Sequence, residues 1–565
     1  MTSLMKFKTD ILVIGGGFAG IWAARKAREY VKDVLIVDKG PLDWGGLGGL
    51  SGGDMVAVFE DEDPDDFLKD FVFYYDGLCN QTAMRRMLRS SLARFRDYES
   101  MGHTFKKKSD GTYANIPQRG LPHVHLTVSA PYGKGGVNLR NELFASIEGL
   151  GIRRLGNVMM THLIKDGERV SGAVGFFNRS GEGIAVEAKA VLLCTNSGGW
   201  KTSYHQNSVA SGCVELALDA GAVLRNMEFL AHWNVPRLFA WEGQTALLPL
   251  GGRFLNSDGQ DFMKERYSPV LGAKTDTHYN CHGMALEFLA GRGPLTFDVS
   301  QIPADIVREL RPRAGWMKLN DEKLQAVGID FFKDTQVWIP QAMFSLGGLV
   351  VDENNMTSVP GLFAAGTAEC SAGAGVYCGG LSMCHCATTG FEAGISAGKY
   401  VSGTDTPSFD DSLARAYAEK DCAALGKSGI APKDVVRTLQ EIVVPLDVSI
   451  LKTAAGLTGA LEKTRELMDG IIPVMGAEDP HYLGKLTEAR GMGLLTECYL
   501  AASLARTESR AGHFRADFPQ RDNKHDVYWV DISRRNGRLK VERTRLPMEE
   551  YPIVPTEYYM DQFTF

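Results

Sequence analysis

Short apolar runs that lead directly into glycines recur along this chain. The first, Ile11–Ile14, is followed at once by Gly-Gly-Gly-Phe-Ala-Gly at residues 15–20. A short run of aliphatic and β-branched residues is typical of a buried strand. A second apolar run, Val34–Val37, ends at Asp38, and small residues mark one face of the helix expected between the runs: Ala23, Ala24 and Ala27. The pattern predicts a strand, a glycine turn, a helix and a second strand that ends in an acidic residue.

This order of elements matches the G-x-G-x-x-G fingerprint of dinucleotide-binding folds. Gly15 permits the tight turn, Gly17 lets the backbone approach a pyrophosphate, and Gly20 allows close packing of helix on strand. The helix N-terminus offers phosphates unpaired N–H groups and a partial positive charge, and Asp38 is placed to accept hydrogen bonds from ribose hydroxyls. We therefore predict a dinucleotide site; the alternative is a glycine turn in an ordinary strand–helix unit.

Similar patterns follow further along the chain. Residues 190–199 and 359–366 each predict a buried strand that ends in a glycine turn. The dense glycine run at 45–53 suits backbone that lies against a flat ring system, with a flexible loop as the alternative. Alanine and leucine at helical spacing continue from 408 to 515, and the Asn-Gly turn at 536–537 predicts a β-hairpin.

Composition excludes several classes of protein. The 565 residues include 63 glycines, 44% hydrophobic and 23% charged residues, as in a large globular protein of about three or four domains. The formal net charge of −7 lacks the basic footprint of nucleic-acid binding. No apolar run approaches the ~20 residues of a membrane span, and no secretory leader is recognised. The ten cysteines form no C-x-x-C pair, so a reducing, cytoplasmic setting is expected.

The most specific segment runs from Thr507 to Asp522, with the sequence Thr-Glu-Ser-Arg-Ala-Gly-His-Phe-Arg-Ala-Asp-Phe-Pro-Gln-Arg-Asp. Taken with the N-terminal fingerprint, the glycine-ended strands and the Gly-Gly-Leu-Ser at 379–382, it resembles the flavoprotein subunits of succinate dehydrogenase and fumarate reductase. L-aspartate oxidase and adenylylsulfate reductase belong to the same superfamily. The resemblance covers nearly the whole chain.

The resemblance implies an α/β fold in four parts. A Rossmann-like FAD-binding domain comprises residues 1–224 and 346–405, and an α+β capping domain, 225–345, is inserted into it. A helical domain, 406–520, and a small β-containing C-terminal domain, 521–565, follow.

Carried over residue by residue, the resemblance implies FAD as the cofactor. Family members usually have a glutamate after the equivalent of Gly366; this chain has Thr367, and Glu369 is close enough for a shifted contact. Many members attach the flavin covalently through a histidine, but none lies between Asp38 and His103, so we expect non-covalent FAD. The residues expected to bind it are Gly15, Gly17, Gly20, Asp38, Lys39, Gly46, Gly49, Ser51, Gly53, Gly366, Glu369, Gly380 and Ser382.

The chain departs from the family most clearly at the substrate positions. Dicarboxylate-handling members use arginines and histidines, because arginine forks bind carboxylates bidentately. This chain keeps His232 but continues with Trp233 and Asn234 in place of proline and threonine. The histidine expected before Gly347, the arginine before Gly379 and the proton-delivering arginine are all replaced. Succinate and fumarate are therefore not expected to be substrates.

Candidates for proton transfer remain in this divergent site. Histidine has a pKa near neutral pH, and tyrosine can serve where a neighbour lowers its pKa. A structural role is the alternative for each histidine. The expected catalytic residues are His232, Tyr377, His282 and His278.

Other reactive side chains receive simpler interpretations. Arg253 and Arg292 are candidate anion ligands, although Arg292 in Gly-Arg-Gly is typical of a turn. His123 and His125 share one face of a strand without further ligands, so no metal site is predicted. Four cysteines that match no cluster motif are explained by packing along a helix: Cys370, Cys378, Cys384 and Cys386.

We predict an FAD-dependent oxidoreductase that transfers hydride between flavin N5 and an organic small-molecule substrate. The chain has no haem-binding C-x-x-C-H and no recognisable electron-carrier extension, so electrons are expected to pass through a separate iron–sulfur, ferredoxin-like subunit. Higher oligomerisation is left open. Two alternatives remain: an oxidase similar to L-aspartate oxidase, and an electron-transfer flavoprotein subunit without a substrate site of its own.

Overall fold

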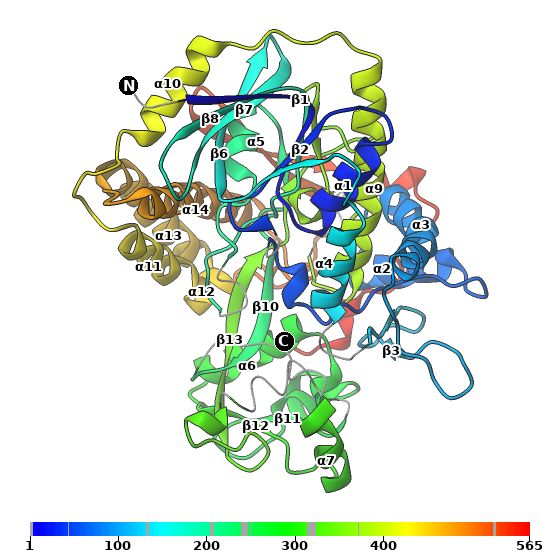
Figure 1. Ribbon diagram of the computed structural model, residues 1–565. Coiled ribbons are helices and arrows are strands. Elements are labelled where there is room, and N and C mark those ends of the chain that lie inside the picture. Colours follow the sequence, from blue (N-terminus) through cyan, green and yellow to red (C-terminus); the bar gives the residue numbers. More distant parts are fainter. Residues whose placement is uncertain are drawn as a thin grey trace.

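The N-terminal domain is organised by a seven-stranded sheet. The computed structural model describes residues 4–565 apart from 43–44, 131–134, 204–207, 239–246, 249, 314–321, 323, 371, 374 and 524–526. The strands of the sheet are β1 (Leu4–Ile14), β2 (Val34–Val37), β5 (Arg153–Leu155), β6 (Val158–Asp166), β7 (Arg169–Phe177), β8 (Gly183–Leu193) and β15 (Leu362–Ala364). They follow the order β5-β2-β1-β8-β7-β6, with β15 beside β8. Figure 1 labels β1, β2, β6, β7 and β8 of this sheet.

The first predicted strand lies at the centre of this sheet. β1 pairs in parallel with β2 and β8, and its side chains alternate between two hydrophobic cores: Ile11 and Val13 in one, Leu12 and Ile14 in the other. The strand begins seven residues earlier than the apolar run. Its first half carries Lys6 and Lys8, which pair with surface carboxylates, so no apolar pattern marked it.

Helix α1 (Phe18–Ala27) packs on the long helix α9 (Leu381–Ser402) through small residues. A Cβ at Gly390 would lie 2.6 Å from the Ala19 carbonyl oxygen, and one at Gly394 only 2.3 Å from that of Ala23. The small-residue helix face predicted from the sequence is therefore confirmed, and its partner is α9. Other elements of this domain are α2 (Pro64–Tyr74), α3 (Gln81–Ser100), β3 (Asn115–Pro117), β4 (His125–Thr127), α4 (Gly135–Ala145) and α5 (Val214–Ala220).

The inserted part forms an antiparallel sheet with helices beside it, at the bottom of Figure 1. Its elements are β10 (Leu230–Pro236), β11 (Arg253–Leu255), α6 (Thr277–Leu289), β12 (Leu295–Asp298), α7 (Ala304–Arg313) and β13 (Gln336–Ser345). The strand order is β10-β13-β12-β11. The expected α+β capping architecture is present.

The last third of the chain is helical and then β. Its helices are α10 (Asp411–Cys422), α11 (Pro432–Val443), α12 (Leu446–Ser449), α13 (Ala454–Glu466) and α14 (Pro480–Ala505). The expected hairpin, β16 (Tyr528–Arg535) and β17 (Arg538–Arg545), joins two short strands, β9 (Leu224–Arg225) and β14 (Gly348–Leu349), in the order β14-β9-β16-β17. No helix in the described part of the chain combines the length and apolarity that a bilayer span requires.

A buried charge network fastens these parts together. Arg506, directly after α14, is completely buried, and its guanidinium lies 2.7 Å from both Glu228 and Glu508. Its Nη2 also donates to the Tyr528 carbonyl oxygen of β16 at 3.0 Å. Lys452 donates to the Glu228 carbonyl oxygen at 2.7 Å. Arg506 thus joins the segment that leads into β10, the end of the helical part and the C-terminal hairpin.

We expect Arg506→Met to destabilise the protein strongly. Removing one member of a buried ion pair leaves its partners as uncompensated buried charges, at a cost of roughly 3–5 kcal/mol. Urea unfolding followed by tryptophan fluorescence should show a clear fall in the midpoint. Arg465→Met is the matched control, because the Arg465–Glu497 pair is largely exposed on the arginine side and is expected to contribute less than about 1 kcal/mol. Equal midpoints for the two variants would contradict the assignment.

Candidate functional site

The glycine turn after β1 is shaped by contacts that only glycine permits. Gly15 has a φ of +112°, and a Cβ there would lie 2.4 Å from the Cys194 carbonyl oxygen. A Cβ at Gly20 would lie 1.9 Å from the Gly15 carbonyl oxygen, so α1 presses on the end of β1. These are the turn and the close packing that the fingerprint assigns to the two positions.

Gly17 differs because the protein leaves space beside it. It is the N-cap of α1 with an ordinary φ of −77°, and a Cβ would have Gly46 Cα as its nearest neighbour, 3.8 Å away. The first bond of α1 runs from Ile21 N to Gly17 O at 3.0 Å, so the N–H groups of residues 18–20 precede the bonded part of the helix. Together with the helix dipole these donors fit the pyrophosphate of FAD.

Asp38 accepts hydrogen bonds from the backbone of the two loops beside it. Its Oδ2 accepts from Gly16 N at 2.7 Å and its Oδ1 from Gly40 N at 2.8 Å. Burial raises the pKa of Asp38 above its usual value, although these donors oppose the rise. Each oxygen keeps lone-pair capacity for a ribose hydroxyl. Lys39 lies elsewhere: its Nζ is 2.7 Å from Glu488 of α14, in an ion pair with the helical part.

The glycine run after Asp38 packs against the start of α4. Gly53 has a φ of +80°, and a Cβ there would lie 2.4 Å from the Gly135 carbonyl carbon. Gly49 lies beside the side chain of an α4 arginine. Ser51 Oγ is 3.9 Å from the Met383 sulfur of α9. The run therefore lies between α1, α4 and the start of α9, where it can line one side of a ring.

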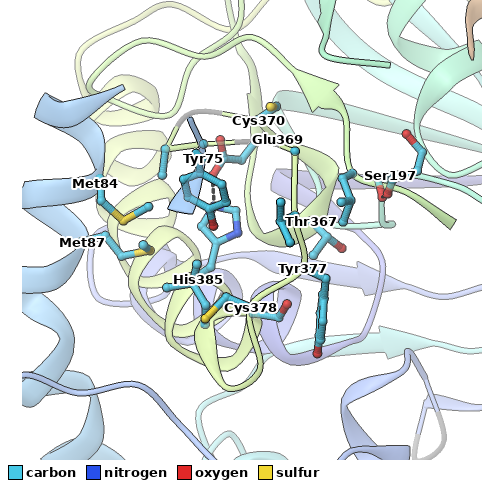
Figure 2. Close-up of a pocket in the computed structure, with 18 of the residues that line it drawn as sticks. Tyr75, Met84, Met87, Ser197, Thr367, Glu369, Cys370, Tyr377, Cys378 and His385 are labelled. Atoms are coloured by element: carbon cyan, nitrogen blue, oxygen red, sulfur yellow. Dashed lines mark hydrogen bonds and ion pairs between the residues drawn. The ribbon is translucent and has the colours of Figure 1, made fainter. Parts of the chain in front are cut away.

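The segment between β15 and α9 lines a pocket (Figure 2). Gly366 (φ +64°) donates its N–H to Thr389 Oγ1 at 2.9 Å, and Gly380 (φ +73°) is the N-cap of α9. Ser382 and Glu369 line the pocket. Glu369 Oε2 is buried without a hydrogen-bond partner, which is the kind of atom that a bound polar group would satisfy. Glu369 and Ser382 therefore fit the ribityl and ring portions of FAD, whereas Gly366 and Gly380 are not among the described residues that line the pocket.

One pocket residue, His385, was not predicted from the sequence. Its Nε2 makes a short hydrogen-bond contact with Glu369 Oε1. Burial lowers the pKa of His385, but the Glu369 carboxylate more than offsets this, so the pKa lies above its usual value. The available signal was its position, about one turn after Ser382 on α9. No motif marks a histidine between two cysteines at this place.

Three of the four expected catalytic residues come together in a sealed cluster between β10 and α6. His232, His278 and His282 are all completely buried, and the ring of His232 lies 5.3 Å from that of His278 and 6.2 Å from that of His282. His232 Nε2 is 2.9 Å from the Ser449 carbonyl oxygen, and His278 Nδ1 is 2.8 Å from Asp276. Burial lowers the pKa of His232 well below its usual value and that of His282 to about 3. Both rings are therefore neutral at neutral pH.

Several polar atoms of this cluster have no partner in the structure. They are His232 Nδ1, both ring nitrogens of His282 and both amide atoms of Asn234. A buried polar atom without a partner costs about 1–3 kcal/mol. The cluster is therefore suited to receive water or a polar group of a ligand.

Tyr377 lies apart from the histidines, in the wall of the pocket. Its ring centroid is 5.8 Å from that of Trp233 and 6.1 Å from that of Phe344. Side chains alternate along a strand, so Trp233 faces the pocket residues while His232 faces α6. A register irregularity between Ala231 and His232 accompanies this change of face.

A hydrogen-bonded path joins the pocket wall to the histidine cluster. Tyr74 donates its Oη–H to Asp276 Oδ2 at 2.7 Å and lies 3.1 Å from the Tyr377 carbonyl oxygen. The other carboxylate oxygen of Asp276, Oδ1, lies 2.8 Å from His278 Nδ1. Burial opposes ionisation of Asp276, but His278 and Arg119, 3.7 Å away, hold its pKa below the usual value. The carboxylate thus fixes the orientation of His278.

The two candidate anion ligands are occupied by carboxylates of the protein. Arg253 pairs with Asp298 at 2.8 Å, and Arg292 pairs with Glu287 at 2.6 Å. Among the described residues that line the pocket there is no arginine or lysine. Neither candidate is therefore free to clamp a carboxylate.

The four clustered cysteines and the His123–His125 pair have surroundings that are explained by structural roles. All four cysteines are reduced, and burial raises the pKa of each thiol. His123 bonds Asp70 at 3.1 Å, and His125 Nδ1 is 3.0 Å from the His123 carbonyl oxygen. Within the described ranges, no group of three or more His, Cys, Asp or Glu side chains is arranged to hold a metal ion.

We expect Gly17→Ala to weaken FAD binding without destabilising the fold. Because the protein leaves room for a methyl group there, only a bound pyrophosphate can clash with it, and the Kd for FAD should rise about tenfold or more, equivalent to 1.4 kcal/mol. Flavin fluorescence titration of the apoprotein measures this. Gly459→Ala, on α13 with no neighbour within 4 Å of the added carbon, is the control. Unchanged affinity in the Gly17 variant would remove the pyrophosphate from this position.

Comparison with known proteins agrees with this geometry. A family model described as an FAD binding domain matches residues 10–381, and another, described as the fumarate reductase flavoprotein C-terminus, matches residues 437–558. The chain is 27% identical over 587 residues to the fumarate reductase flavoprotein subunit of Mycobacterium tuberculosis, covering 97% of this chain and 99% of that protein. It is 25% identical over 557 residues to the L-aspartate oxidase of Streptomyces coelicolor, covering 92% and 90%.

The fold comparison points the same way. A solved structure of E. coli quinol fumarate reductase FrdA matches with a TM-score of 0.86 over 98% of this chain and 99% of that chain, at 20% identity. The expected four-part architecture and FAD as cofactor are confirmed. The chain belongs to the FAD-dependent oxidoreductases of the succinate dehydrogenase and fumarate reductase flavoprotein family.

Proposed function

We propose that this oxidoreductase transfers hydride between flavin N5 and an organic substrate other than succinate or fumarate. The observation that carries the proposal is that both candidate anion ligands are paired with carboxylates of the protein, Arg253 with Asp298 and Arg292 with Glu287. The aromatic rings of Trp233, Phe344 and Tyr377 pack against one another beside the pocket assigned to the flavin. Two carboxylates need cationic forks to replace their hydration. A substrate with fewer charges and more apolar surface suits this site better.

FAD supplies the hydride chemistry when it is bound, and the chain's own residues supply positioning and proton handling. The rings of Trp233 and Tyr377 exclude water from the reacting position. His278 is oriented by Asp276 at 2.8 Å, and its neighbours His232 and His282 present unpartnered nitrogens. Because these two rings are neutral, they accept a proton or a hydrogen bond more readily than they donate a charge-balancing proton.

We further propose that electrons pass through a separate iron–sulfur subunit. Two relatives support this proposal, because each is named as one flavoprotein subunit of a larger enzyme: the fumarate reductase protein of Mycobacterium tuberculosis, and the 8-methylmenaquinol:fumarate reductase protein of Wolinella succinogenes, 26% identical over 603 residues. The sequence also carries no haem-attachment motif of its own.

Fumarate should fail to reoxidise the photoreduced enzyme. In anaerobic stopped-flow experiments we expect flavin absorbance to return no faster with fumarate than with buffer, whereas a singly charged or uncharged unsaturated compound should restore it. Rapid reoxidation by fumarate, on the order of 1 s⁻¹ or faster, would show that the site binds dicarboxylates after all. Photoreduced free FAD is the control for direct chemistry. Once a substrate is found, the double variant His232→Gln with Tyr377→Phe should slow its turnover about 100-fold. An unchanged rate would remove both residues from the reaction.

Purification from the native host should yield a complex that contains iron and acid-labile sulfide. The isolated chain should then turn over only with an artificial electron acceptor such as a viologen dye. Steady turnover of the isolated chain with oxygen, with one peroxide released for each substrate oxidised, would instead support an oxidase similar to L-aspartate oxidase.

A further inference from the structure

The Glu369–His385 pair is a charged element in the wall of the flavin-side pocket. Glu369 follows the short turn at Gly366, and His385 lies in the second turn of α9. One oxygen of Glu369 contacts His385 Nε2, while the other, Oε2, is buried with no partner. Figure 2 shows the two side chains joined by a dashed line.

Burial of Glu369 with one oxygen unpartnered is energetically unfavourable, which is unusual for a contact with a purely structural role. Glu369 is only 3% exposed, and a buried carboxylate normally fills its hydrogen-bonding capacity. The unpartnered Oε2 belongs to a pocket residue, and that pocket is also lined by Thr367 and Ser382. FAD offers suitable donors, the ring N3–H and the ribityl hydroxyls. Either kind of donor suits the unpartnered Oε2 of Glu369.

We propose that the Glu369–His385 pair holds the isoalloxazine end of FAD and sets its reduction potential, with the imidazolium of His385 balancing the negative charge that the ring gains on reduction. Two electrons and one proton convert the oxidised ring into a monoanion. A positive charge near the ring favours that form, and a negative charge disfavours it. The proposal concerns the flavin alone and is independent of the substrate and the electron partner proposed above.

The charges around His385 are consistent with a protonated ring. Burial lowers the pKa of His385, but Glu369 and, more weakly, Glu392 raise it above the usual value. Glu392 lies on the same helix and is itself paired with Arg86 of α3 at 3.2 Å. Three further titratable groups that line the pocket stay neutral, because burial raises their pKa values: Tyr75, Cys370 and Cys378. His385 is therefore the cationic group of this pocket among the residues described.

His385→Gln tests the proposal, because glutamine keeps an N–H donor for Glu369 and removes the charge. The variant leaves a lone carboxylate beside the ring, so the flavin midpoint potential should fall in a xanthine oxidase titration with reference dyes. Sulfite, which adds to flavin N5 and creates an anionic adduct, should bind about tenfold or more weakly. The double variant Glu369→Gln with His385→Gln should bring both values back toward those of the parent protein.

His162→Gln is the matched control, since His162 also pairs with a buried carboxylate, Asp421 at 3.3 Å, but lies on β6 under α10. It should leave potential and sulfite affinity unchanged. Flavin-replete His385→Gln with the parent's potential and sulfite affinity would overturn the proposal. If that variant loses FAD, Glu369→Gln is decisive. In Glu369→Gln, the break in the plot of flavin midpoint potential against pH should move to lower pH, because His385 loses the carboxylate that raises its pKa. A break at the parent's pH would equally overturn the proposal.

Discussion

The buried charge network around Arg506 is the constraint on which the site depends. Charges buried this deeply are tolerated only when each finds its partners, so the segments that carry them have one compatible arrangement. Arg510 extends the network by donating to the Asp76 carbonyl oxygen at 2.6 Å. Two residues later, Gly512 N donates to the Gly375 carbonyl oxygen at 2.9 Å. Because Gly375 lines the pocket, the most specific sequence segment of the chain positions a pocket wall without lining the pocket itself.

The nucleotide-binding half of the fold was predictable because its signals are local. A strand, a glycine turn and a helix within about twenty residues leave few alternatives. The structure has β1, α1 and β2 at the predicted positions, with β1 beginning seven residues before its apolar run. The sheet that includes the C-terminal hairpin was only half predictable. Its other strands, β9 and β14, have two residues each, and no periodicity marks so short a strand.

Which residues belong to the site was more predictable than how their side chains are oriented. His232, His278 and His282 were all expected to be catalytic residues, and the structure places their rings close together. Which face His232 takes depends on the irregular register of β10 against β13, since a shift of one residue moves every side chain to the opposite face. Nothing in a single sequence specifies that shift. Likewise Glu369 and His385 are 16 residues apart and meet only because the loop folds back on α9.

Burial lowers the pKa of every histidine discussed here, and their charged neighbours are what separates their roles. Around His232 and His282 burial acts with neighbouring imidazoles and a lysine, so the pKa values fall and the rings stay neutral. Around His385 the same desolvation is outweighed by a carboxylate at hydrogen-bond distance, so the charged form is favoured. A neutral cluster can accept a proton, while a cation in the flavin-side pocket can stabilise an anionic ring. One protein can thus keep proton acceptance and charge stabilisation on separate histidines at a single pH.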